Sequence, residues 1–149
     1  MDPFARNMLR STLAFAVALL VIFALMTLIY IHIHPQCPDA VLAEAESPSH
    51  RFVAAVLQRR CGEESPFITQ VSLRDGSQKL RRGFLSGEVN QGIVFRVEQD
   101  AAGADLSLTW TGPDELTIQC PRCQAAFLRQ RDAQWGAVRI AYVPTKVVP

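Results

Sequence analysis

The sequence predicts one N-terminal transmembrane helix followed by a mostly β exterior domain, built as an antiparallel meander of about six short strands. Two observations predict this fold class. A long segment near the N-terminus carries no charged side chain, and after residue 50 apolar residues recur with a period of two. With 149 residues, the chain has room for one domain and an appendage. We expect a cytoplasmic N-terminus (1–11), a transmembrane helix (12–34), a linker (35–50) and the exterior β domain (51–149).

The uncharged segment runs from Thr12 to Ile33 and has no Asp, Glu, Lys or Arg in its 22 residues. A helix of that length covers roughly 33 Å, enough for a bilayer core of about 30 Å. A cleaved signal peptide or a lipoprotein signal that ends at Cys37 is the alternative. Residues 28–36 are bulky almost throughout and lack the small side chains of a processing site, so we expect the helix to be retained.

Flanking charge predicts the orientation of this helix. Arg6 and Arg10 precede it, and the next basic residue is Arg51, so the positive-inside rule places the N-terminus in the cytoplasm and the domain outside. Beyond the helix, 13 Lys and Arg balance 13 Asp and Glu. A formally neutral domain lacks the basic face that nucleic acid requires, so we expect no nucleic-acid partner.

Alternation of apolar and polar residues predicts the strands. They are Arg51–Arg59, Phe67–Arg74, Ile93–Glu98, Leu106–Thr111, Glu115–Cys120 and Gly136–Val143. The strand 51–59 is apolar on both faces, as in a central strand. In the strand 93–98, we expect Ile93, Phe95 and Val97 to face the core. Gly112-Pro113-Asp114 predicts a hairpin.

Three segments are less regular. Residues 41–46, rich in Ala and Glu, are expected to form a helical turn or two within the linker. Residues 76–92 contain four glycines and predict a long loop, with at most one short strand around Phe84 and Leu85. Residues 124–134 fit a short helix or a loop equally well.

A resemblance follows from Ser47-Pro48-Ser49-x-Arg51, Cys61-Gly62, Phe67-x-Thr69-x-Val71-Ser72 and Leu108-x-Trp110. This pattern resembles S-P-D-G-x-[YR]…C-G-A-T-T-x-F-x-T-x-V in small single-pass or lipid-anchored bacterial envelope proteins that form a domain-of-unknown-function family. The resemblance covers about residues 47–143 and departs from the pattern at 49–50 and 63–65. It implies bacterial origin, and therefore an inner-membrane anchor and a periplasmic β domain, but no activity.

Four cysteines lie beyond the helix: Cys37, Cys61, Cys120 and Cys123. An even number in an oxidising compartment predicts disulfides. We prefer the pairs Cys37–Cys61 and Cys120–Cys123, and pairing of Cys61 with Cys120 or Cys123 stays open.

The motif Cys120-Pro121-Arg122-Cys123 also fits other chemistry. A C-x-x-C pair can be a dithiol redox couple, which needs the first Cys at a helix N-terminus, or half of a zinc site, which needs a second pair. Neither context is evident, because the motif follows a strand in an all-β segment. We therefore interpret it first as a structural staple.

The remaining candidates for chemistry are weak. His32 and His34 beside Cys37 fit interfacial anchoring better than a metal site, and His50 lacks the nucleophile and carboxylate of a triad. We expect neither a cofactor nor a metal. In the loop 74–82, Lys79, Arg81 and Arg82 are candidate contact residues for an acidic partner or for anionic lipid headgroups.

The expected function is that of a non-enzymatic, membrane-anchored periplasmic module that binds a protein partner. An accessory or assembly factor and an immunity-type protein both fit this description. The alternative is a thiol-redox or metal-handling protein that uses Cys120 and Cys123.

Overall fold

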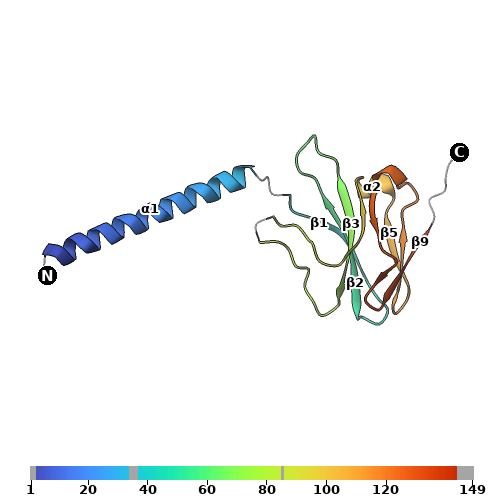
Figure 1. The fold of residues 1–149 in the computed structure, drawn as a ribbon. Coiled ribbons are helices and arrows are strands. Elements are labelled where there is room, and N and C mark those ends of the chain that lie inside the picture. Colours follow the sequence, from blue (N-terminus) through green and yellow to red (C-terminus); the bar gives the residue numbers. More distant parts are fainter. Residues whose placement is uncertain (1–2, 34–36, 85, 144–149) are drawn as a thin grey trace. The chain divides into compact units, whose positions relative to one another are not determined.

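The computed structural model describes residues 3–33, 37–84 and 86–143, and it divides the chain into two compact units, Met1–Gln36 and Cys37–Pro149 (Figure 1). The first unit is the helix α1, Pro3–Ile33. Within its segment Met8–His32, an 18-residue window has a mean hydropathy of 2.8, and none of that window is buried within the protein. By length and composition it could cross a membrane, and a signal sequence near the N-terminus meets the same criteria.

The second unit is a β-rich domain with two sheets (Figure 1). The first sheet is antiparallel and has the order β1 (Ala40–Glu46), β2 (Phe52–Arg59), β3 (Ile68–Asp75), β4 (Ile93–Val97) and β7 (Leu128–Arg131). The second has the order β5 (Ser107–Gly112), β6 (Glu115–Gln119), β9 (Val138–Val143) and β8 (Gln134–Trp135). A short helix α2 (Ala101–Ala104) follows β4, and a 3-10 turn η1 (Ala125–Phe127) precedes β7.

One hydrophobic core joins the two sheets. It takes Phe52, Ala54, Val71, Leu73, Val94, Phe95 and Val97 from the first sheet and Leu116, Ile118, Val138 and Ile140 from the second. Trp110 on β5 packs at the edge of this core and donates a hydrogen bond from Nε1 to the carbonyl of Ala45 on β1, 2.9 Å away. Burial of these apolar side chains is the main driving force that holds the sheets together.

The expectation of an apolar helix and a β domain is confirmed, but the simple antiparallel meander is wrong. Strands lie in all six expected segments, with shifts at their ends, and β2 is a central strand that is buried on both faces. The meander fails because β6 and β9 are parallel. Between β6 and β9 the chain crosses to β7 in the other sheet and comes back through β8, so β9 does not follow β6 as a hairpin partner.

Residues 41–46 belong to the edge strand β1, so the expected helical turns there are wrong. The Ala/Glu composition favours a helix locally, but this segment pairs with β2 along its whole length. Such pairing satisfies the backbone of the buried strand β2 on one side, and tertiary context of this kind overrides local propensity. Sequence pattern also missed the short strands β7 and β8, which carry mostly polar residues.

The expected orientation of the side chains in β4 is wrong at its start, because this strand contains a β-bulge. Phe95 pairs with Val71 but Ile93 pairs with Ser72, so Val94 is the extra residue. Val94 consequently enters the core between the sheets, whereas Ile93 packs on the opposite face of the first sheet. A bulge reverses the alternation at one residue, which a strict period of two does not anticipate.

Residues 76–92 form a long loop, as expected, and we call this segment the strap. Its described residues contain no strand, and Leu85 lies outside them. The strap lies over the outer face of β2 and β3, the face that points away from the second sheet. Val89 is fully buried there against Ala55 and Leu57 of β2, and Ser72 of β3 donates a hydrogen bond to the carbonyl of Gln91.

Candidate functional site

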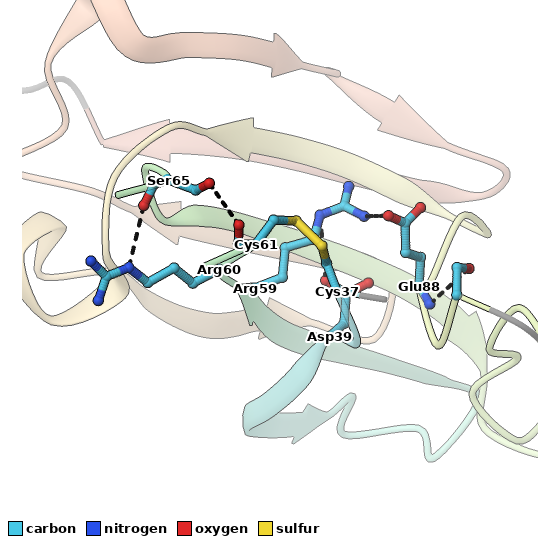
Figure 2. The surroundings of a disulfide bond; sticks show 8 residues. Cys37, Asp39, Arg59, Arg60, Cys61, Ser65 and Glu88 are labelled. Carbon is cyan, nitrogen blue, oxygen red and sulfur yellow. Dashed lines mark hydrogen bonds and ion pairs between the residues drawn. A yellow bond between two sulfur atoms is a disulfide. The ribbon is translucent and has the colours of Figure 1, made fainter. Parts of the chain in front are cut away.

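A buried carboxylate lies where the domain begins, beneath the strap (Figure 2). Asp39 is only 1% exposed, and its Oδ2 accepts hydrogen bonds from the backbone N–H of Val89 at 2.6 Å and from Nε2 of Gln70 at 3.1 Å. The backbone N–H of Asp39 donates to the carbonyl of Gly87. Burying a carboxylate is costly unless its oxygens find donors or a counter-charge. Oδ2 has both donors, whereas Oδ1 accepts no hydrogen bond in the described part of the chain, so Asp39 ties the start of the domain to the strap and to β3 through Oδ2.

Arg59, at the end of β2, completes this network (Figure 2). Its guanidinium is nearly buried, with one nitrogen 2.6 Å from Glu88 Oε1 on the strap and Nε 3.9 Å from Asp39 Oδ1. On the other side, Gln70 Nε2 also donates to the carbonyl of Val89, and Gln70 Oε1 accepts from Arg96. The strap is therefore fastened by charged and polar contacts as well as by Val89.

The Cys37–Cys61 disulfide adds a covalent tie at the same place (Figure 2). It joins the first described residue of the domain to the loop after β2, with a Cα–Cα distance of 5.1 Å. Cys37 is buried and Cys61 is exposed. Residues 37–46, which the sequence assigns to a linker, are thus held by a disulfide, a buried carboxylate and the pairing of β1 with β2.

The strap carries the three candidate contact residues, Lys79, Arg81 and Arg82, and all three are exposed. None of them forms an ion pair with a residue that the structure describes. Phe84 lies two residues further on and is 100% exposed. We call residues 79–84 the strap tip. Leu80, within it, is half-buried against the apolar cluster of the outer face, which fixes the base of the tip.

Two hydrogen bonds close a turn around Phe84. The N–H of Gly83 donates to the carbonyl of Glu88 at 2.8 Å, and the N–H of Gly87 donates to the carbonyl of Gly83 at 2.9 Å. Gly87 has a positive φ of 66° and lies so close to Pro38 that a Cβ there would come within 2.8 Å of the proline Cβ. Glycine is therefore required where the strap meets the first residues of the domain.

The second disulfide, Cys120–Cys123, closes a turn immediately after β6, and the structure thus has the two pairs that we preferred. The N–H of Cys123 donates to the carbonyl of Cys120 at 3.1 Å, and Cys120 is only 7% exposed. The next element is the three-residue turn η1, which is too short to supply a helix dipole. A redox couple needs an accessible first sulfur at a helix N-terminus, so this geometry favours the structural role.

A cavity of about 110 Å³ lies beside this disulfide, lined by Phe95, Ile118, Cys120, Cys123, Gln124, Ala125, Leu128, Arg131, Tyr142 and Val143. The guanidinium of Arg131 stacks over the ring of Tyr142, 4.2 Å from its centroid. The Tyr142 hydroxyl donates to the carbonyl of Asp132 at 2.7 Å. Burial, with a smaller contribution from the Asp132 carboxylate, raises the pKa of Tyr142 to about 12. Tyr142 therefore stays protonated at neutral pH and is a poor general base.

Metal and hydrolase chemistry have little support in the described part of the chain. No group of three or more His, Cys, Asp or Glu residues that could hold a metal ion occurs there. His34 lies outside the described residues, and Cys37 has no thiolate to offer because it is in a disulfide. His50 lies on an exposed turn, where its Nδ1 is 3.0 Å from Glu46.

The chain matches no protein-family model, no curated protein and no solved structure. The resemblance to small bacterial envelope proteins therefore stays a prediction, and the function has to be argued from the site itself.

Sequence reasoning missed the residues that organise this site. Asp39 lies in a segment that the sequence assigns to the linker, and the pattern contains no signal for its burial. Gln70 and Ser72 alternate with apolar residues along β3, a pattern that usually indicates a solvent-facing side. The sequence pattern places Phe84 in a loop with at most one short strand and gives it no role in binding. An aromatic residue next to three cations in a glycine-bounded loop was the signal that could have singled it out.

Proposed function

We propose that this protein is a non-enzymatic module, anchored by α1 in the inner membrane of a bacterium, that binds a protein partner at the periplasmic surface. One observation carries the proposal: the chain joins the folded domain almost directly after the apolar helix. Cys37 is bonded to Cys61 and Asp39 is buried under the strap, so residues 37–46 are part of the domain.

The chain segment that connects helix and domain is short. Four residues lead from Ile33 to Cys37, and a chain of that length spans at most about 14 Å. An enzyme that acts on a soluble substrate gains nothing from so short a connection. A module that recognises a protein of the same membrane gains a high effective concentration, because its surface is held near that of its partner.

The absence of a recognisable catalytic set supports the same conclusion for the described residues. The C-x-x-C motif is oxidised and largely buried at its first cysteine, and Tyr142 is held protonated. An assembly or accessory factor and an immunity-type protein both fit a small, anchored, disulfide-bonded domain of this kind.

Membrane topology is the first test. A reporter that is active only in the periplasm should be active when fused after Pro149 and inactive when fused before Met8. Mass spectrometry of the protein from cells should find residues 1–36 still attached, and alkaline carbonate should not extract it. Activity of the N-terminal fusion in the periplasm would reverse the orientation, and a mature N-terminus after residue 33 would make α1 a signal sequence.

Partner capture is the second test. Affinity purification of the full chain from native membranes should recover the same protein in stoichiometric amounts, and insertion of a flexible linker of about 20 residues before Cys37 should weaken recovery severalfold. Recovery that is indifferent to the linker would contradict the argument from the short connection. Mixed disulfides that Cys123→Ser traps with a defined protein would replace this proposal by the thiol-redox function.

A further inference from the structure

The strap tip combines an exposed aromatic ring with exposed positive charge. Phe84 is 100% exposed, and Lys79, Arg81 and Arg82 are exposed beside it in sequence. None of the three cations is neutralised by an acidic side chain within the described part of the domain. Aromatic rings and basic residues together are the chemistry of segments that bind the interface of an anionic bilayer.

The position of the tip relative to the start of the domain matters as much as its chemistry. The turn 83–88 is closed by its own hydrogen bonds and abuts Pro38, and the N–H of Asp39 donates to the carbonyl of Gly87. The buried contacts of Asp39 with Val89 and of Arg59 with Glu88 hold the strap there. Pro38 follows Ile33 by five residues, and such a length of chain spans at most about 18 Å.

With the anchoring by α1 proposed above as its premise, we propose that residues 79–84 bind the anionic phospholipid headgroups of the bilayer that holds the helix. The three cations attract the lipid phosphates, with about a fivefold gain in binding for each cation, and the Phe84 ring enters the interfacial layer. The bilayer is always present beside an anchored domain, so even weak contacts are populated. Docking of the tip orients the domain and leaves its other faces available to the protein partner.

Hydrogen exchange of the full chain in lipid nanodiscs tests this proposal. The backbone N–H groups of Arg81 and Arg82 make no hydrogen bond to any residue that the structure describes, so they should exchange fast when the tip is in water. In discs of phosphatidylcholine with about 30% phosphatidylglycerol, we expect exchange in peptides covering 79–84 to slow about tenfold or more relative to pure phosphatidylcholine. Salt at about 0.5 M should remove most of the difference, because it screens charges at the membrane surface.

Two variants distinguish the contribution of the positive charges to binding from that of the inserted Phe84 ring. Arg81→Glu/Arg82→Glu should abolish the protection, and Phe84→Ser should reduce it while leaving the salt dependence in place. The control is Arg122→Glu/Arg139→Glu, which makes the same change in net charge at exposed positions outside the strap. It also removes the surface ion pair of Arg139 with Glu115 in the second sheet, and it should leave the protection unchanged. All the substituted residues are exposed, so Trp fluorescence and the thermal midpoint should show that the domain of each variant stays folded.

Equal exchange in the two kinds of disc would overturn the proposal, as would equal loss of protection in the control variant. Protection that appears in native membranes but not in discs with phosphatidylglycerol would assign the tip to a protein partner instead, and would also overturn it. These outcomes are independent of partner capture and of the state of residues 1–36 in cells. Failure of headgroup binding therefore leaves the proposed function standing, and failure of the anchor is detected separately.

Discussion

Neighbouring residues of β3 point to opposite faces of the five-stranded sheet, and both faces are buried. Val71 and Leu73 enter the hydrophobic core between the two sheets. Gln70 and Ser72, on the other face, are as deeply buried but lie under the strap. Their side chains donate hydrogen bonds to the carbonyls of Val89 and Gln91.

The comparison shows that the two faces are covered for different reasons. The inner face is closed by apolar area, which is non-directional and roughly proportional to the surface removed from water. The outer face is closed by a small apolar cluster around Val89 together with specific polar contacts. Such polar contacts are worth little net when made but are costly when one partner is lost. Damage to the inner face should therefore lower the stability of the whole domain, whereas damage to the outer face should first release the strap.

The largest effect is expected from Leu73→Ala on the inner face. The side chain is fully buried, and its truncation leaves a cavity between the sheets, so we expect a loss of about 3–4 kcal/mol in the free energy of unfolding. Urea denaturation of the full chain in detergent, followed by Trp fluorescence, measures this loss for the domain alone, because both tryptophans, Trp110 and Trp135, lie in it. A loss below about 1 kcal/mol would mean that the core collapses around the site, contrary to the packing described.

One disulfide lies at the outer face of the five-stranded sheet, and the other lies at the edge of the inner core. Cys37–Cys61 has a sequence separation of 24 and fastens the outer side, so its replacement by serines should cost roughly 3 kcal/mol by the chain-entropy estimate. Cys120–Cys123 has a separation of 3 and lines the edge of the inner core, and its replacement should cost about 2 kcal/mol.

Cysteine alkylation gives a further readout for the disulfides. If both are structural, all four cysteines should resist alkylation in protein taken from cells until a reductant is added, and the potential of each pair should lie below about −300 mV. A Cys120 thiolate that reacts near neutral pH would contradict the structural role of the second pair.

How far the sequence predicts this fold depends on which face is considered. The apolar helix, the central strand β2 and the hairpin β5–β6 follow from periodicity and from Gly112-Pro113-Asp114, because local pattern and burial agree there. The strand β1 and the burial of Gln70 are not predictable in this way. Both depend on contacts between distant parts of the chain, and polar composition does not reveal a polar face that a loop will cover.

Asp39→Ala tests the outer face directly. The change leaves the N–H of Val89 without its acceptor, and it removes one of the two acceptors of Gln70 Nε2, which keeps the carbonyl of Val89. It also removes the carboxylate beside the nearly buried Arg59, so we expect a loss of about 2 kcal/mol. Hydrogen exchange should accelerate first at residues 76–92, before the core strands open. Asp39→Asn keeps an acceptor oxygen at this position and should retain much of the protection. A uniform acceleration across the domain would show that the strap and the core unfold together, and the distinction between the two faces would fail.

The smallest effect is expected at the rim of the inner core, where Tyr142 combines an apolar ring with a satisfied hydroxyl. Because the pKa of Tyr142 is raised to about 12 in the folded protein, against about 10 in an unfolded chain, the unfolded state loses this proton first as the pH rises. The stabilisation is therefore complete below about pH 10 and is lost as the pH approaches 12. The ring is only partly buried, so we expect about 1 kcal/mol rather than the full value that the pKa difference implies.

Urea midpoints at about pH 9 and pH 11.5 measure this loss, and Tyr142→Phe supplies the control for the other groups that titrate in this range. The wild-type protein should lose more stability than the variant between the two pH values. An equal loss would mean that the hydroxyl is solvated in the folded state, and that the contact with the Asp132 carbonyl at 2.7 Å does not persist in solution.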